Sequence, residues 1–160
     1  MVKNSKNLLI KFIFLVSIIA LVSAFFIEYI LGHQPCNLCV LERIPYILAI
    51  IVVLFNYKFI QFERFFILLL TIIFLAGTIL SLYHLGIEQG FIQESLVCDL
   101  KNGSNLLSKE EILKQLQEKS VSCKDVTFKI FGLSLTSYNI LISLLITVGT
   151  GKIYFNYDKN

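Results

Sequence analysis

The sequence has no tryptophan, only two prolines and only eight glycines among its 160 residues. The scarcity of proline and glycine leaves little room for linkers or low-complexity tails, and the chain has no evident internal repeat. Charge is scarce as well, because Asp, Glu, Lys and Arg make up 16% of the chain. The formal net charge of +3 is small and unclustered, so the sequence gives no indication of nucleic-acid binding.

Apolar residues, by contrast, make up 56% of the chain, and the mean hydropathy is +0.77. A soluble domain of this size could not cover that much apolar surface. The composition indicates an integral membrane protein, and the length favours a single domain over residues 1–160. We therefore expect an all-α membrane fold: a four-helix transmembrane bundle with a short amphipathic helix in its long outer loop.

Charged residues interrupt the apolar runs and mark four expected spans. They cover approximately residues 8–31, 38–57, 65–83 and 130–151, and crossing the hydrocarbon core takes about 20 residues. The first span has an alternative interpretation as a signal peptide, because residues 22–24 (VSA) resemble a cleavage site. The apolar run continues past them through Phe25 to Ile27, which favours a retained anchor.

The second span has an unusual start. Only residues 44–57 are free of charge there, which is too short to cross the membrane. A helix of full length must start near Leu38, so Cys39 and Arg43 fall in its first turns at the membrane boundary. Pro45 would then lie inside the helix, where it removes a hydrogen bond and bends the chain.

The number of spans predicts which segments share a side. With four spans, both chain ends lie on one side, and outer loops 32–43 and 84–129 lie on the other. Lysines precede the first span, and Lys58 and Arg64 flank the turn after the second, which favours cytoplasmic chain ends. The long outer loop also contains a capping-box pattern from Ser108 and an apolar stripe, which predict the amphipathic helix.

All four cysteines fall in the two outer loops, as expected where a compartment is oxidising. Cys36 and Cys39 form a C-x-x-C, whereas Cys98 and Cys123 lie far apart. Both pairs could be structural disulfides, but a C-x-x-C ring closes too little chain to stabilise the fold much. It is typical of redox proteins, and the first turn of a helix would stabilise a Cys39 thiolate. A structural zinc site is disfavoured, because such sites take two closely spaced pairs.

Arg43 lies four residues after Cys39, so the two share a helix face. Only Arg43 and Arg64 are arginine among the fourteen basic residues, so lysine supplies generic positive charge in this chain. One interpretation is an anchor whose charge reaches out to the membrane rim. We favour a fixed cation that stabilises the thiolate and donates a hydrogen bond to an acceptor in the membrane.

Several segments together resemble the DsbB family of quinone-linked membrane oxidoreductases. They are "CNLCVLER" at the second span, "YHLGIEQG" at the end of the third, Cys98, Cys123 and then "FGLSL". The resemblance covers nearly the whole chain, although Thr136 stands where relatives often have proline and no tryptophan is present to make aromatic contacts. The vitamin K epoxide reductase-like enzymes are an alternative, but in them the C-x-x-C follows the loop pair. A non-enzymatic scaffold with structural disulfides is another.

The resemblance implies a two-disulfide relay in a bacterial inner membrane. Cys98 would be attacked by a periplasmic thioredoxin-like oxidant of the DsbA kind, and Cys123 would exchange with Cys36. Electrons would leave from Cys39 to ubiquinone or menaquinone held beside Arg43. The reduction potentials supply an independent argument for a quinone. A structural disulfide has a potential below about −300 mV and DsbA one of about −120 mV, so an isolated structural disulfide could not keep oxidising such a partner. A C-x-x-C coupled to a membrane quinone could.

His84 and Glu88 stand at the outer end of the third span, four residues apart on one helix face. They are candidates to border the quinone, and we predict His84 as a cofactor-binding residue beside Arg43. A plain interfacial histidine is the alternative for His84. The relay residues themselves are Cys36, Cys39, Cys98 and Cys123, and we expect no metal.

Overall fold

The computed structural model describes residues 2–93, 98, 122–124, 129–130 and 132–157. Within this part of the chain, four helices are long and apolar enough to cross a membrane. These spans are Lys6–Tyr29, Asn37–Lys58, Ile60–Glu88 and Leu135–Phe155. The predicted all-α four-helix bundle is therefore confirmed. The amphipathic helix expected from Ser108 lies outside the described residues.

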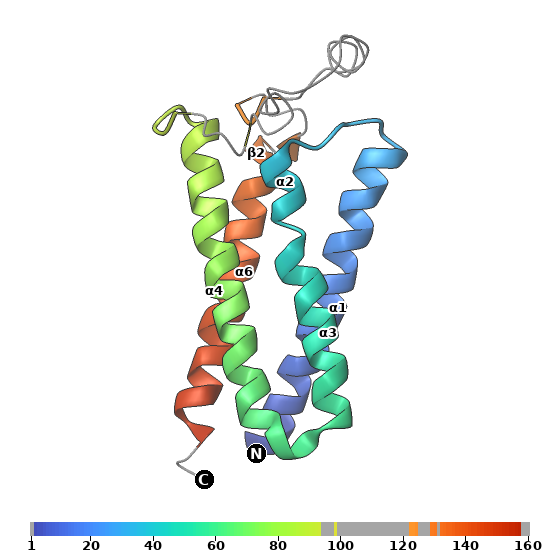
Figure 1. Cartoon of the computed structure of the whole chain (residues 1–160), viewed down its shortest axis with the longest axis vertical. Helices are drawn as coiled ribbons and strands as arrows, with labels where there is room; N and C mark the ends of the chain where they lie inside the picture. Colours follow the sequence, from blue (N-terminus) through green and yellow to red (C-terminus); the bar gives the residue numbers. More distant parts are fainter. Residues whose placement is uncertain (1, 94–97, 99–121, 125–128, 131, 158–160) are drawn as a thin grey trace, which may run out of the picture.

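The described elements follow one another as helices with a single short hairpin before the last (Figure 1). The helices are α1 (Val2–Tyr29), α2 (Asn37–Leu41), α3 (Ile44–Lys58), the 3-10 turn η1 (Ile60–Phe62), α4 (Glu63–Glu88) and α6 (Leu135–Phe155). The antiparallel strands are β1 (Lys129–Ile130) and β2 (Leu133–Ser134). Both chain ends lie at one end of the bundle, and α2 and β2 lie at the other.

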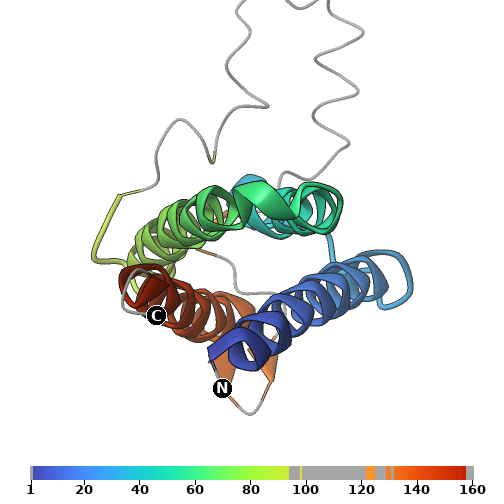
Figure 2. The ribbon, with the colours of Figure 1, turned by 90° about the horizontal axis from the view of Figure 1, so that it is seen from below.

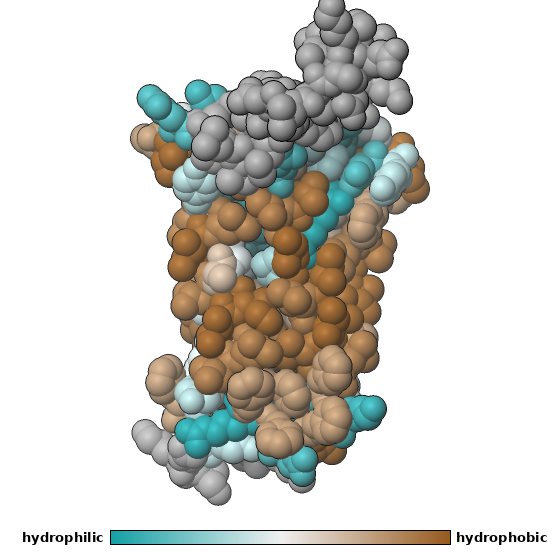
Figure 3. All heavy atoms as spheres, in the orientation of Figure 1, coloured by the Kyte–Doolittle hydropathy of each residue, from teal (hydrophilic) through white to brown (hydrophobic). Residues whose placement is uncertain are grey.

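The four long helices form a ring when seen along the bundle (Figure 2). Helix α4 packs closely against α6, while α3 packs on both α1 and α4. Contact between α1 and α6 is much sparser, so the ring is closed more loosely there. Apolar side chains cover a broad band around the visible face, and hydrophilic residues gather at its two ends (Figure 3). A band of this kind suits contact with lipid.

The second span is two helices rather than one bent helix. Helix α2 ends at Leu41, α3 begins at Ile44, and Pro45 occupies the first turn of α3. Proline fits there because its missing N–H would have had no partner in a first turn. A Cβ atom on Gly77 would lie 3.1 Å from Pro45 Cγ. Gly77 therefore lets α4 approach α3 closely where the new helix starts.

Two other boundaries differ from the sequence-based expectation. The fourth span begins at Leu135 rather than at residue 130, because the preceding residues form the hairpin, with Gly132 at φ +83° in its turn. The side chain of Ser134 then caps α6 by accepting from the backbone N–H of Ser137. Helix α4 runs on to Glu88, beyond the expected end at residue 83.

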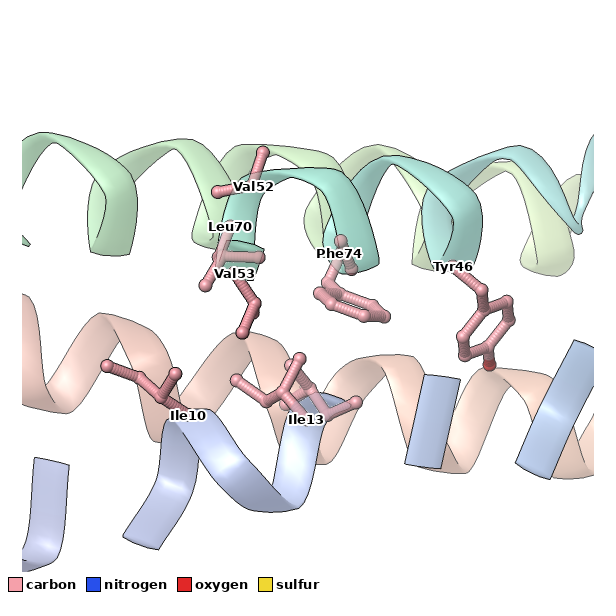
Figure 4. Packing of buried hydrophobic residues seen from close by; sticks show 9 residues of the cluster. Ile10, Ile13, Tyr46, Val52, Val53, Leu70 and Phe74 are labelled. Carbon is pink, nitrogen blue, oxygen red and sulfur yellow. The ribbon is translucent and has the colours of Figure 1, made fainter. Parts of the chain in front are cut away.

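A compact apolar cluster fills the bundle on the side of the chain ends (Figure 4). Its buried members are Ile10, Ile13, Tyr46, Ala49, Val52, Val53, Leu70, Phe74 and Ile146. The rings of Tyr46 and Phe74 meet edge to face at 5.7 Å between centroids. The Tyr46 hydroxyl points away from the cluster toward α6, where it donates to Asn139 Oδ1. We call these nine residues the apolar core.

Candidate active site

The C-x-x-C motif lies at the start of α2, with Cys36 as its N-cap residue. Cys36 Sγ accepts a hydrogen bond of 3.2 Å from the backbone N–H of Cys39. Both residues are free thiols, and their Sγ atoms are 2.7 Å apart. Sequence reasoning assigned the helix N–H groups to a Cys39 thiolate. The structure instead directs such a group at Cys36, because Cys36 occupies the cap position.

The sulfur of Cys36 is held in a charge-stabilising environment. The pKa of Cys36 is lowered from 9.0 to about 5, and the largest cause is the hydrogen bond from the Cys39 thiol. Burial opposes this effect, whereas His84 and the Cys39 backbone N–H add to it. The thiolate form of Cys36 is therefore favoured at neutral pH. Because a thiolate and not a thiol is the nucleophile in disulfide exchange, Cys36 is prepared for attack.

His84 lies in the last turn of α4 and is 1% exposed. Its Nε2 is 3.5 Å from Cys36 Sγ, and its Nδ1 is 2.8 Å from Glu42 Oε1. An ionised carboxylate only accepts hydrogen bonds, so Nδ1 carries a proton and Nε2 faces the sulfur. The thiol, the imidazole and the carboxylate thus lie in a row in space. This arrangement orients the histidine to exchange a proton with the sulfur.

Glu42 is fixed from the other side by Asn139 of α6. Asn139 Nδ2 donates to Glu42 Oε2 at 3.0 Å and to Ser81 Oγ at 2.8 Å. With the Tyr46 hydroxyl bound to its Oδ1, Asn139 joins α3, α4 and α6 in one network. Sequence reasoning missed Asn139. The amide within a predicted membrane span was the available signal, because polar groups inside membranes are costly and mark function.

Thr136 connects the histidine to Glu88. Its hydroxyl donates to Glu88 Oε1 at 2.6 Å and lies 3.2 Å from His84 Nδ1. Glu88 Oε1 is also 3.8 Å from His84 Nε2, and Glu88 Oε2 is buried with no hydrogen-bond partner in the structure. Thr136 therefore takes part in the polar network through its hydroxyl.

The second cysteine pair is brought to the first. Cys98 and Cys123 form a disulfide with their Cα atoms 6.0 Å apart. Cys123 is 2% exposed and shares a buried cluster with Cys36, and Cys98 packs against that cluster. The side chain of Asn37 also donates to the backbone carbonyl of Cys98 at 3.3 Å. All four predicted cysteines therefore meet at one end of the bundle, one pair oxidised and one pair reduced.

A cavity of about 530 Å³ opens from this site into the bundle. Cys36, Cys39, Arg43, His84 and Cys123 line its outer end. Farther from the thiols the wall is apolar and comes from α1 and α6, through residues such as Phe12, Val16, Ile19, Ile142 and Leu145. Its position matches the sparse contact between α1 and α6. The cavity therefore joins a polar, reactive end to a long apolar wall.

Arg43 lines this cavity together with Cys39, as their spacing predicted. Its Nη1 donates to Glu28 Oε2 at 2.6 Å, and its guanidinium lies 5.2 Å from the centroid of the Phe25 ring. Both partners belong to α1, and sequence reasoning missed them. Arg43 is therefore tied across the cavity to the first helix, and one arm of its planar fork is already engaged.

The four-span bundle brings a C-x-x-C with free thiols and a separate disulfide together beside one cavity. These features define a class of membrane proteins that carry out thiol–disulfide exchange. The family model for "Disulfide bond formation protein DsbB" matches residues 6–152, and the chain belongs to this family. It is accordingly a thiol–disulfide oxidoreductase that acts in disulfide bond formation. The chain is also 35% identical over 150 residues to the uncharacterized protein RP370 of Rickettsia prowazekii (strain Madrid E), covering 91% of this chain and 85% of that protein. No solved structure matches.

Proposed function

We propose that this protein reoxidises a DsbA-like periplasmic dithiol oxidant and passes the electrons to a membrane quinone. The observation that carries the proposal is the meeting of all four cysteines at one end of the bundle, where Cys36, Cys39 and Cys123 line the polar end of one apolar-walled cavity. Neither a scaffold with two structural disulfides nor a surface redox motif calls for such a cavity. The order of the cysteine pairs also argues against the vitamin K epoxide reductase-like alternative.

The relay begins at the loop disulfide. A thiolate of the reduced partner attacks Cys98 Sγ, forms a mixed disulfide and releases Cys123 as a thiolate. The second partner thiol then resolves the mixed disulfide, so the partner leaves oxidised and Cys98 is reduced. Contact of Cys98 and Cys123 with the Cys36 cluster supports exchange between the pairs, which oxidises the loop pair and leaves both electrons on Cys36 and Cys39.

At the end of that exchange the loop pair is bonded again and the C-x-x-C carries both electrons. His84 then has a defined task. Its Nε2 faces Cys36 Sγ and takes up or returns the thiol proton, while Glu42 balances the charge through Nδ1. The resemblance gives Cys39 the role of passing the electrons on, and its place in the cavity wall supports that role.

A quinone fits the cavity by volume and by chemistry. Ligand pockets commonly hold about 300–1,000 Å³, and the volume here is about 530 Å³. Arg43 would hold a quinone carbonyl oxygen by a hydrogen bond, His84 would border the quinone headgroup from the cavity wall, and the α1 and α6 wall would take an isoprenoid tail. When bound, the quinone supplies the two-electron acceptor that returns Cys36 and Cys39 to the disulfide. Whether it is ubiquinone or menaquinone depends on the membrane that holds the protein.

The orientation that fits this function has the chain ends in the cytoplasm and the cysteine loops in the periplasm of a bacterial inner membrane. The charge distribution around the first two spans supports this orientation. A thiol reagent that cannot cross membranes should label reduced Cys98 in intact spheroplasts. Labelling that requires an opened membrane would invert the topology and remove the oxidising compartment.

Turnover by the purified full chain tests the function. Beyond the stoichiometric amount that the protein's own disulfides oxidise, we expect reduced DsbA-like partner to be oxidised only when a soluble ubiquinone or menaquinone analogue is added, with one quinone reduced per partner. The Cys36→Ser/Cys39→Ser variant is the control, and it should reduce no quinone. Partner oxidation at the same rate without any quinone would contradict the proposal.

A further inference from the structure

Three ligand-type side chains converge at the reduced C-x-x-C. The sulfurs of Cys36 and Cys39 and a ring nitrogen of His84 all lie within 4.8 Å of one another. We propose that these three groups form a Zn²⁺ site that exists only while the C-x-x-C is reduced, and that a metal bound there blocks the relay. Zinc was disfavoured on the sequence because the four thiols do not form two close pairs. The structure supplies a ligand that thiol spacing could not reveal.

The distances fit a tetrahedral zinc site after one small adjustment. With Zn–S near 2.3 Å and Zn–N near 2.0–2.1 Å, a tetrahedral site separates sulfur from nitrogen by about 3.5 Å and the two sulfurs by about 3.8 Å. Cys36 Sγ and His84 Nε2 are 3.5 Å apart already. The sulfurs, 2.7 Å apart, must separate by about 1 Å. Cys39 is only half-buried and borders the cavity, so its side chain has room to turn.

The surroundings resemble those of a metal ligand set more than those of a plain dithiol. A zinc-bound histidine commonly donates its other ring N–H to a carboxylate, which orients the ring. Glu42 Oε1 accepts from His84 Nδ1 at 2.8 Å, and Asn139 fixes the other oxygen of Glu42. The backbone N–H of Cys39 points at Cys36 Sγ, as it would toward a metal-bound thiolate. The polar groups behind the ligands are thus already in place.

The same groups leave the metal one open position. Three protein ligands and a water are typical of open zinc sites, and the cavity provides space next to Cys39 for the fourth ligand. Zinc would therefore lie at the polar end of the cavity, where the proposed quinone headgroup would lie. The two ligands would compete, and this part of the inference rests on the proposed function.

Zinc binding depends on the redox state of the C-x-x-C because only the reduced sulfurs can become thiolate ligands. In the Cys36–Cys39 disulfide neither sulfur is a thiolate, and no Zn–S bond forms. When the pair is reduced, Zn²⁺ binds two thiolates and the imidazole, and the thiol protons are released to water. The metal is not oxidised or reduced. Binding therefore holds the two electrons on the C-x-x-C, which is the block that we propose.

Metal titration of the reduced full chain in detergent tests the site, with no quinone or partner present. Zn²⁺ in competition with a chromogenic chelator should bind one ion per reduced chain and none after oxidation of Cys36 and Cys39. Co²⁺ as a second probe should give thiolate-to-metal absorption typical of a tetrahedral site. The Cys98→Ser/Cys123→Ser variant is the matched control, and it should still bind one ion.

Variants of the ligands decide the assignment. Cys36→Ser/Cys39→Ser should abolish binding, and His84→Ala should weaken it, with recovery in His84→Cys. Glu42→Gln keeps all three ligands and should weaken zinc binding about 10- to 100-fold through the orienting contact alone. Equal affinity in the oxidised chain, or unchanged affinity in both His84→Ala and Glu42→Gln, would overturn the site. Because these readouts need no turnover, they can fail while the quinone-linked activity holds, or hold while it fails.

Discussion

The two halves of the bundle bury polar groups in opposite ways. Around the apolar core, threonine hydroxyls bond back to their own helix, as Thr78 does to the Phe74 carbonyl and Thr150 to the Ile146 carbonyl. At the thiol end, side chains bond between helices, as Glu42 of the α2–α3 junction does with His84 of α4 and Asn139 of α6. Interhelical bonds fix the position of one helix against another, whereas bonds within a helix do not.

This difference separates positioning from cohesion. Lipid is as apolar as the core side chains, so the hydrophobic effect does not drive the helices together. The apolar core therefore holds them by close van der Waals contact alone. The thiol end must hold a nucleophile, a histidine and an arginine at defined distances around a cavity, and it does so with directional bonds. Changes at the thiol end should therefore alter chemistry, and changes in the core should alter stability.

Removing one relay thiol should give the largest effect. In Cys123→Ala, Cys98 has no partner to exchange electrons with the C-x-x-C, so catalytic turnover should be lost. In Cys123→Ala the free Cys98 thiolate can attack the disulfide of oxidised partner, which releases one partner thiolate and leaves a Cys98–partner disulfide that non-reducing gels detect. A Cys98→Ser/Cys123→Ala double variant, run beside it with oxidised partner, should form no covalent complex. Turnover at the normal rate in Cys123→Ala would refute the two-pair relay.

The pKa of Cys36 gives the next effect. Because that pKa is lowered from 9.0 to about 5, chiefly by the Cys39 thiol, Cys36 should react as a thiolate down to about pH 5 and lose reactivity below it. Cys39→Ala removes the donor and should move the midpoint toward 9.0, with roughly tenfold less thiolate at pH 6. Cys39→Ser keeps an O–H donor and should shift it less.

The measurement is methyl methanethiosulfonate labelling of reduced Cys36 against pH, followed by mass spectrometry. The same sign applies to stability: the lowered pKa stabilises the reduced fold fully above about pH 9, and that contribution declines as the pH falls and is lost below about pH 5. Equal midpoints in Cys39→Ala and the unchanged protein would show that the hydrogen bond does not set the pKa.

The sequence predicted the fold well because the membrane imposes it. Apolar runs between charges identified all four spans, and their number placed the two ends of the chain together. The boundaries that failed are set locally. The hairpin before Leu135 depends on a turn at Gly132 that hydropathy does not register. Pro45 was expected inside a helix, but it lies in the first turn of α3. Its ring packs against Gly77 of α4, a contact between helices that the sequence does not reveal.

The sequence identified residues that line the candidate site better than it identified the residues that hold them in place. Cys36, Cys39, Arg43 and His84 all line one cavity. Glu28, which pairs with Arg43, and Asn139, which fixes Glu42, come from other helices. No spacing rule predicts which face of one helix meets which face of another. Hydrogen-bond partners across helices are fixed by the fold and become visible only with it.

Each half of the bundle has an ion pair between helices, formed by Arg43 in one half and by Lys6 in the other, and the two pairs can be compared. Arg43 pairs with Glu28 at the thiol end, and Lys6 pairs with Glu63 at 3.2 Å near the chain ends. A planar fork is needed only if Arg43 also positions a quinone oxygen. Arg43→Lys should then raise the quinone KM about 10- to 100-fold, since a charge-assisted hydrogen bond contributes about 1.5–3 kcal/mol.

Lys6→Arg is the control and should leave the quinone KM unchanged. The assay is quinone reduction by reduced partner at varied quinone concentration. Expression and formation of the Cys98 mixed disulfide should be intact in both variants, because neither contact touches the loop pair. An unchanged KM in Arg43→Lys would make Arg43 an anchor at the membrane rim, equivalent to Lys6.

The smallest effect on chemistry is expected from the apolar core. Phe74 is fully buried, and Phe74→Ala leaves a cavity among Tyr46, Val53 and Leu70. Because the alternative surroundings are lipid, only the contact energy is lost, which we expect to be about 1–3 kcal/mol. Unfolding of the variant in mixed micelles should show this loss, whereas Phe65→Ala, at an exposed position, should show almost none.

The reactivity of Cys36 and the quinone KM should not change in Phe74→Ala if the halves are independent. The most direct route for a connection runs through Tyr46, whose ring packs on Phe74 and whose hydroxyl binds Asn139. A shift of that ring would loosen Asn139, then Glu42, and finally the histidine that faces Cys36. A lower thiolate fraction at Cys36 in Phe74→Ala would therefore show that cohesion and positioning are coupled through this one tyrosine.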